Sequence, residues 1–277
     1  MISHLVNTKL QSMSDTRSDL EQDVVSRLTP FLCSTLASIL VSRCIDLGQT
    51  ITKDIFNWYQ LSLDSDRMSS MLKFASMLYC RGHYERAAEV LSYCEGLLEK
   101  LEVCQCCGHY ERAGQEPSTE FENKLITTSN TEMLKKYIMI CITFTREEIN
   151  CFPQHLAFEM LRGIEGEDKL GTAKWKYNVV TDCIPFLYYL QHLNSRELHQ
   201  PRIAQIALHN LHEYTMDTME TEHGHIDTAF NMLGHCYELQ TRQDLAWMCY
   251  NNSMEIYDRC NASIWHAARL LYQFLQR

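Results

Sequence analysis

Apolar residues recur at intervals of three and four along most of the chain, which is the spacing of one face of an α-helix. The pattern first predicts a helix from Asp19 that Pro30 ends or kinks. Further helical stretches are predicted over residues 31–47, 54–61, 68–80, 84–98, 131–150, 179–193 and 203–214, from Pro153 onward, and from His225 to the end. No segment shows sustained alternation of apolar and polar residues, so we predict no sheet.

One long polar stretch divides the chain. Residues 105–130 hold Gly108, Gly114 and Pro117 and lack a sustained period, so we predict a surface loop there. The regions on either side of this loop are predicted to be helical apart from a frayed N-terminus. They are the frayed residues 1–15, the N-terminal helical region 16–104 with a helix hairpin at 66–100, and the C-terminal helical region 131–277 with a helix pair at 225–258 and a closing helix at 262–276.

The pair at 225–258 matches the 34-residue tetratricopeptide pattern, in which two antiparallel helices cross at small residues and large residues fill the gaps between pairs. Thr241 and Gln243 replace the usual turn glycine and tyrosine, so we expect a less typical reversal. The matching residues are Phe230 at position 4, Leu233 and Gly234 at 7 and 8, Tyr237 at 11, Ala246 at 20, Tyr250 at 24 and Ser253 at 27.

The earlier hairpin matches the complementary half of the same pattern. With Gly82 at position 15, Tyr84 falls at 17, Ala87 at 20 and Leu91 at 24. We therefore predict an all-α fold of antiparallel helix pairs, stacked as a tetratricopeptide-like right-handed solenoid. Generic helical hairpins of an unrelated bundle are the alternative.

A solenoid of this kind presents its first helices along a concave groove, and we predict that a protein partner of unknown identity binds there. Ordinary helix surface is the alternative for each groove position. The lysines and asparagines that clamp a chaperone's C-terminal carboxylate in some repeat proteins are missing from these positions. The predicted partner-binding residues are Ser69, Leu72, Ser76 and Tyr79 in the first pair, and Thr228, Asn231, His235 and Glu238 in the later pair.

The net charge and the composition argue against two classes of partner, nucleic acids and membranes. The net charge is −10 and no block of Lys and Arg stands out, so we expect no nucleic-acid binding by this chain alone. The longest apolar stretch, residues 31–41, is far short of the roughly 20 residues that cross a bilayer, so we expect no membrane partner. The 13 cysteines follow no N-terminal signal peptide, and we predict a reducing, cytoplasmic setting in which most of them act as small buried hydrophobes.

Signatures of catalysis are missing from the chain: it holds no GxSxG, GxxxxGK[ST], GxGxxG or HExxH motif. We therefore expect no catalytic residue and no cofactor. Cys104, Cys106, Cys107 and His109 are the one cluster that suggests a metal, but they span six residues and no second CxxC exists, which strains one tetrahedral site. We predict no metal, with a metal-stabilised module as the alternative.

Several phrases resemble the C-terminal region of invertebrate, especially molluscan, proteins of the male-abnormal (Mab) nucleotidyltransferase family, which includes the cyclic GMP-AMP synthase-like receptors. They are LTPFLC at 28–33, LKFASMLYC at 72–80, FTREEINC at 144–151, DCIPFLYYL at 182–190 and WHAARLLY at 265–272. The family's catalytic module needs Gly-Ser followed by a Glu-x-Asp pair. No Gly-Ser dipeptide occurs here, and Asp64 and Asp66 have nothing suitable before them. The resemblance thus implies the helical region without the nucleotidyltransferase core.

These observations favour a non-enzymatic protein–protein interaction scaffold or adaptor. The alternative, implied by the resemblance, is the regulatory C-terminal tail of a Mab-type nucleotidyltransferase that lacks its catalytic domain.

Overall fold

The computed structural model describes residues 19–63, 68–98, 104–106, 138–165, 177–219, 224–256 and 261–276, and most of these are helical. Four short strands lie between α5 and α8 in the order of the chain. The α-helices are α2 (Asp19–Asp46), α3 (Lys53–Leu63), α4 (Met68–Cys80), α5 (Tyr84–Leu98), α8 (Cys183–Glu197), α9 (Pro201–Met219), α10 (Ile226–Leu239), α11 (Gln243–Ile256) and α12 (Ser263–Leu275). Two 3-10 helices, η1 (Arg146–Glu148) and η2 (Gln154–Glu165), precede α8.

The same tight turn joins the helices of three pairs, α4 with α5, α8 with α9, and α10 with α11. In each turn one residue has a positive φ: Gly82 at 74°, His199 at 55° and Thr241 at 62°. The next amide donates to the carbonyl five residues back, at 2.9, 2.8 and 2.9 Å respectively, which is the Schellman ending of a helix. Thr241 therefore makes the same reversal as Gly82, and the expectation of a less typical turn there is wrong.

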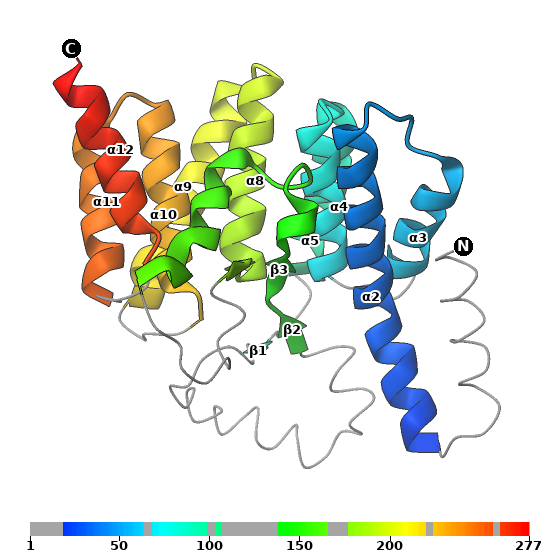
Figure 1. The fold of residues 1–277 in the computed structure, drawn as a ribbon. Helices are drawn as coiled ribbons and strands as arrows, with labels where there is room; N and C mark the ends of the chain where they lie inside the picture. Colours follow the sequence, from blue (N-terminus) through cyan, green and yellow to red (C-terminus); the bar gives the residue numbers. More distant parts are fainter. Residues whose placement is uncertain are drawn as a thin grey trace.

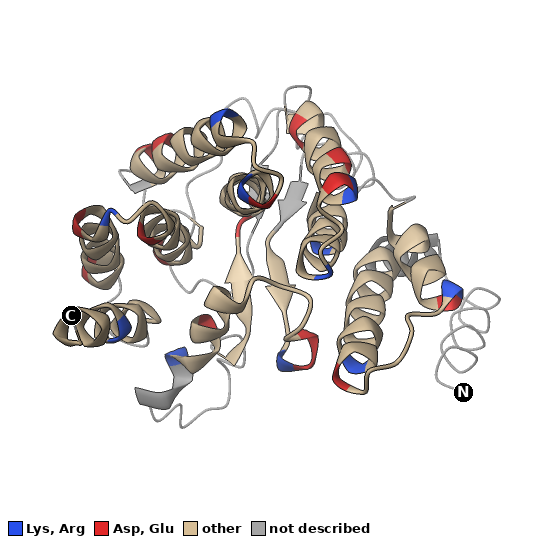
Figure 2. Cartoon of the chain, turned by 90° about the horizontal axis from the view of Figure 1, so that it is seen from above, with Lys and Arg blue, Asp and Glu red and all other residues tan. Residues whose placement is uncertain are grey.

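The helices stand side by side in a row, with α2 and α3 at one end and α12 at the other (Figure 1). Seen from above, the row bends into an arc, and the strands with η2 lie on its inner side (Figure 2). We refer to residues 142–162 as the inner segment. None of the described helices is both long enough and apolar enough to cross a membrane.

Two small sheets replace part of a predicted helix. β1 (Cys104–Cys106) pairs in parallel with β2 (Ile138–Ile140), and β3 (Ile142–Phe144) pairs antiparallel with β4 (Val179–Thr181). The prediction of no sheet is therefore wrong at all four strands. The predicted helices over 131–150 and 179–193 are wrong for residues 138–150 and 179–181. Strands of three residues are too short for alternation to be recognised in the sequence, and β4 is buried throughout, so polar residues have no reason to alternate there.

Further boundaries differ from the prediction. The helices predicted over 179–193 and 203–214 are α8 (Cys183–Glu197) and α9 (Pro201–Met219) in the structure. α2 continues through Pro30, where two helices were expected. A proline removes one helical hydrogen bond, but the turns that follow are held by Cys33, Ala37 and Val41, which are buried against α3 and α4. The stretch after Pro153 forms the 3-10 helix η2 rather than an α-helix. The predicted frayed terminus 1–15 and the larger part of the predicted loop 105–130 lie outside the described residues.

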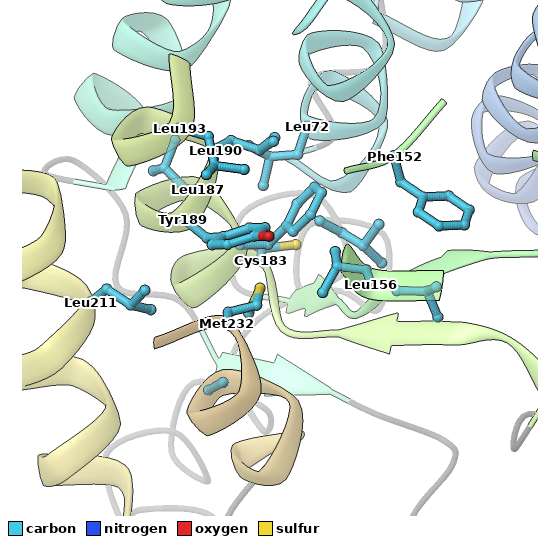
Figure 3. Close-up of a cluster of buried hydrophobic side chains, with 14 of the residues drawn as sticks. Leu72, Phe152, Leu156, Cys183, Leu187, Tyr189, Leu190, Leu193, Leu211 and Met232 are labelled. Atoms are coloured by element: carbon cyan, nitrogen blue, oxygen red, sulfur yellow. The ribbon is translucent and has the colours of Figure 1, made fainter. Parts of the chain in front are cut away.

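The main core joins the inner segment to the helices around it. Phe152 and Leu156 belong to one buried cluster with side chains of α4 and α8, among them Leu72 and Leu187 (Figure 3). The Phe144 ring lies 5.2 Å from the Phe152 ring, centroid to centroid. These apolar side chains are almost fully buried, so the inner segment is part of the core and not a loop laid over it.

Candidate functional site

The predicted groove of the first pair is covered by the inner segment. Ser69, Leu72 and Ser76 are buried, and the Ser76 hydroxyl donates to the carbonyl oxygen of Cys151 at 2.8 Å. Tyr79 is half-buried, with its ring 5.7 Å from that of Tyr84. The four residues do share one side of α4, as the tetratricopeptide pattern predicts. The expectation that they form an open groove is wrong, because the chain itself fills that space.

A buried ion pair fastens α4 to the inner segment. The Lys73 ammonium lies 2.9 Å from Glu148 Oε1, and both side chains are almost completely buried. The second Glu148 oxygen accepts from the backbone N–H of Thr145 at 2.8 Å, and Lys73 also donates to Thr35 Oγ1 at 3.0 Å. Each charge thus has a partner of opposite sign and a further hydrogen bond, which is the condition under which a buried pair is tolerated.

The predicted groove of the later pair is covered in the same way. Thr228 and Asn231 on α10 are fully buried. The Thr228 hydroxyl donates to the carbonyl oxygen of Val180 at 3.1 Å, and the Asn231 amide donates to Glu159 Oε1 at 2.8 Å. Both partners belong to η2 or β4. The open-groove prediction is therefore wrong here as well, while the placement of these residues on the inner side of the arc agrees with the pattern.

A buried charge cluster lies between η2 and α10. The Arg162 guanidinium forms ion pairs with the carboxylates of Glu159 and Asp227, and it donates to Thr228 Oγ1 at 2.6 Å. Burial alone raises the pKa of Glu159, but the Arg162 charge and the hydrogen bonds outweigh it and bring the pKa down to about 2. Glu159 is thus ionised at neutral pH, and the cluster holds η2 against the first helix of the later pair.

Next to this cluster, aromatic rings stack through the inner face. The His155 ring lies 3.7 Å from the His235 ring at 6° and 4.2 Å from the His266 ring at 17°. His266 in turn stacks on Tyr250 at 5.0 Å. His235 Nδ1 shares a hydrogen bond of 2.7 Å with the Tyr189 hydroxyl. His235, predicted as a groove residue, is therefore half-buried and held by contacts from two other elements.

Burial and neighbouring positive charge lower the pKa values of two imidazoles in this stack, His155 and His235. Desolvation, followed by the charges of His266, His235 and Arg269, lowers the pKa of His155 well below its usual value. Desolvation and Arg269 also lower the pKa of His235, to about 3. Both rings are neutral at pH 7, as a face-to-face stack requires, because two imidazolium ions at 3.7 Å would repel each other strongly.

Glu238, the last predicted groove residue, is half-buried and closes the stack on the side of α12. Its Oε1 accepts hydrogen bonds from the Tyr250 hydroxyl and from the Arg269 guanidinium. The Glu238 carboxylate thus binds both Tyr250, at position 24 of the repeat pattern, and Arg269 of the closing helix. Reversing the charge of Glu238 would place two positive groups side by side, so such a variant tests the fold more than a partner.

The candidate site as a whole is an internal network in which most described polar groups bind one another, while the two ring nitrogens of His266 are buried without a hydrogen-bond partner. The imidazoles of His155 and His235 are neutral at pH 7, and the described carboxylates of the site are engaged by an arginine, a lysine, an amide or a hydroxyl. Sequence reasoning found the residues of α4 and α10 but missed His155, Glu159, Arg162 and His266. The one local signal was the spacing of Glu159 and Arg162 at i and i+3, which is common on any helix.

Metal chemistry finds no support in the described part of the chain, where no group of three or more His, Cys, Asp or Glu side chains is arranged to hold an ion. The cluster from Cys104 to His109 lies almost wholly outside that part: only the backbone strand of Cys104–Cys106 is described. The metal-stabilised alternative therefore stays a prediction.

Comparisons with known proteins leave the family open. No protein-family model, curated protein or solved structure matches the chain.

Proposed function

We propose that the chain is a non-enzymatic, cytoplasmic scaffold for protein–protein interaction, built of tetratricopeptide-like helix pairs stacked as a right-handed solenoid. Its inner face is occupied by its own residues 142–162, and its partner surface is the outer face of the second helices α5, α9 and α11. The partner therefore binds the outer side of the arc and not the inner side, where the sequence pattern predicted the groove.

Small residues at the close crossings of two helix pairs support the repeat architecture. Ala87 and Ala246, at position 20 of their repeats, have no exposed surface. Gly234, at position 8, lies against Tyr250 at position 24, and a Cβ atom there would come within 2.6 Å of the tyrosine ring. Such contacts need small residues where the tetratricopeptide pattern has them, and the shared turn geometry of the three pairs agrees with this.

The observation that carries the proposal is the division of exposed apolar side chains between first and second helices. The described side chains of α4, α8 and α10 include no exposed large hydrophobic residue, since these helices contact the inner segment and their own partners. The second helices carry five, which are Tyr93 on α5, Ile203 and Ile206 on α9, and Trp247 and Met248 on α11. Aromatic residues and methionine are enriched at interfaces.

The best-defined part of this surface is on α9. Ile203 and Ile206 are separated by three residues and so lie on the same face, each about half exposed. Two branched apolar side chains held on a rigid helix can fill a partner's pocket without losing much conformational freedom on binding. We expect this face to contribute most to binding a protein partner.

Affinity purification of the intact chain, compared with the double variant Ile203→Asp/Ile206→Asp, tests the surface. The amount of partner captured by the double variant should be at least tenfold lower than for wild type. Its helicity and melting temperature should stay close to wild type, because both side chains are already exposed. Leu61→Asp on α3 is the matched control, since Leu61 is equally exposed but lies outside the second helices. Equal capture by all three proteins would contradict the proposal.

A second candidate, the regulatory tail of a Mab-type nucleotidyltransferase, rests on where two resembling phrases lie. The phrases at 144–151 and 182–190 meet in the core, where the Phe144 and Phe186 ring centroids are 5.8 Å apart. Phrases that form one core are what a detached helical region would keep. A contiguous reading frame that encodes Gly-Ser followed by Glu-x-Asp would favour this candidate, and a transcript without it would remove its basis.

A further inference from the structure

Three histidines from three different elements meet face to face on the inner side of the arc. His155 belongs to η2, His235 to α10 and His266 to the closing helix α12. The His155 ring stacks on both of the others, 3.7 Å from His235 and 4.2 Å from His266. We refer to these three residues as the histidine stack. Because each ring comes from a separate element, the stack joins η2, α10 and α12 at one point.

The closed stack disfavours a positive charge on His155. Desolvation, followed by the charges of His266, His235 and Arg269, lowers the pKa of its ring well below the usual value. The Tyr250 hydroxyl lies 3.4 Å from His155 Nε2, and the same hydroxyl donates to Glu238. The titratable and charged groups that face His155 in the described part of the chain are thus His235 of α10, Tyr250 of α11, and His266 and Arg269 of α12.

Glu159 is a negative group beside the stack, and its charge favours a proton on His266. Its Oε1 is 3.9 Å from His266 Nε2, which is beyond hydrogen-bond distance, and it already accepts from the Asn231 amide. The Glu159 carboxylate is also paired with Arg162. Neither ring nitrogen of His266 has a hydrogen-bond partner. The closed arrangement therefore offers a protonated His266 little compensation, and acid favours opening of the stack.

Of the three elements in the stack, α12 is the one that can leave at the lowest cost. Leu156 anchors η2 in the main core and Arg162 pairs it with α10, while α10 packs against α8, α9 and α11. Among the described elements, α12 packs mainly on α11. Its buried side chains are Ser263, His266, Ala267 and Leu270. An element with few buried apolar contacts opens locally at a lower free energy than the whole domain.

We propose that the histidine stack is a pH-sensitive switch, in which protonation of His155 releases α12 from the arc while the other helices stay folded. Release removes His266 and Arg269 from the neighbourhood of His155 and lets water solvate the protonated ring. It also uncovers the apolar surface against which Leu270 packs, formed by Tyr250 and Ala246 of α11 with Tyr237 of α10. The switch does not depend on the proposed scaffold function, because the outer faces of α5, α9 and α11 take no part in it.

The direction and the size of the effect follow from proton linkage. The pKa of His155 is lowered with α12 in place and should return to its ordinary value, about 6.5, once α12 has left. Below that pH the open form therefore binds one more proton than the closed form, and release becomes about tenfold more favourable for each pH unit. Between pH 7.5 and 5 the equilibrium constant for release should rise about thirtyfold for His155 alone.

Hydrogen–deuterium exchange of the full chain, followed by mass spectrometry of its peptides, tests the switch. After correction for intrinsic exchange rates, the amides of α12 should lose protection about thirtyfold between pH 7.5 and 5. They should be less protected than the amides of α4 at both pH values, and circular dichroism should show that helicity is retained. In His155→Gln, α12 protection should change by less than about threefold, because the titrating group is gone. His209→Gln replaces an exposed histidine of α9, and this matched control should behave as wild type does.

Three results would overturn the proposal. One is α12 protection in wild type that is unchanged or higher at pH 5, as an ion pair between His266 and Glu159 would produce. Another is α12 protection equal to that of α4 at pH 5, which would mean that the helix opens only with the whole chain. The third is a loss of protection in His155→Gln as large as in wild type. His155→Phe keeps a planar ring in the stack without a titrating nitrogen, and it takes the place of His155→Gln where circular dichroism shows that variant to be unfolded.

Discussion

Gly234 offers a direct test of how the later pair is packed. It lies in the middle of α10, and a Cβ atom added to it would stand 2.6 Å from Cε1 and 2.9 Å from Cζ of Tyr250. The tyrosine cannot retreat easily, since its ring is fully buried and stacks on His266 at 5.0 Å. Its hydroxyl is also bound to Glu238. Gly234→Ala should therefore destabilise the protein.

The size of the effect follows from two opposing contributions. Alanine is favoured over glycine in a helix interior by about 1 kcal/mol. An extra methyl group forced into a packed core costs about 1–3 kcal/mol, and a contact this short belongs at the upper end. We expect a net loss of about 2 kcal/mol in the free energy of unfolding. Gly96 in α5 has nothing within 4 Å of the same atom, so Gly96→Ala should instead stabilise by up to about 1 kcal/mol.

Urea unfolding followed by circular dichroism at equilibrium measures both variants. A two-state transition with an unchanged slope allows the free energies to be compared directly. Repeating Gly234→Ala in a Tyr250→Leu background isolates the contact, because the smaller side chain should remove most of the penalty. The reasoning is refuted when Gly234→Ala is as stable as wild type, or when its cost is the same in both backgrounds.

Two further predictions concern the internal network. Lys73→Met should lower the free energy of unfolding by about 3–5 kcal/mol, because it leaves Glu148 buried without its partner. The double variant Lys73→Met/Glu148→Gln should regain a large part of that free energy in urea unfolding. A double variant as unstable as Lys73→Met would contradict the ion-pair account. Because the pKa values of His155 and His235 are lowered in the folded chain, the unfolded chain binds protons first as the pH falls below about 6.5. The contribution of His235 to the free energy of unfolding should be complete above that pH and should fall by about 1.4 kcal/mol per pH unit toward pH 3. In His235→Gln the urea midpoint should therefore depend less on pH between pH 7.5 and 5 than in wild type. An equally steep dependence in the variant would contradict the prediction.

The residues of the candidate site show where sequence reasoning stopped. The repeat pattern placed Asn231 and His235 on the inner side of α10, and the structure has them there. The repeat pattern does not predict which segment of the chain packs against these residues. Glu159 is 72 residues from Asn231, and no periodicity within either helix relates the two. Positions that look like a free groove in one helix pair are thus core positions once the inner segment is in place.

The sequence by itself determined that most of the described chain is helical, the bounds of α4 and α5, and which small residues lie where the helices of a pair meet. Apolar periodicity reports which face of each helix leaves water, and small residues such as Ala87 and Ala246 mark the crossings, because both depend on neighbours within about 34 residues. Only the tertiary structure decided that residues 142–162 fill the inside of the arc. That choice depends on contacts such as Lys73 with Glu148, 75 residues apart, whose pairing follows from the path of the whole chain. A local pattern records that a side chain is buried but not which distant segment buries it.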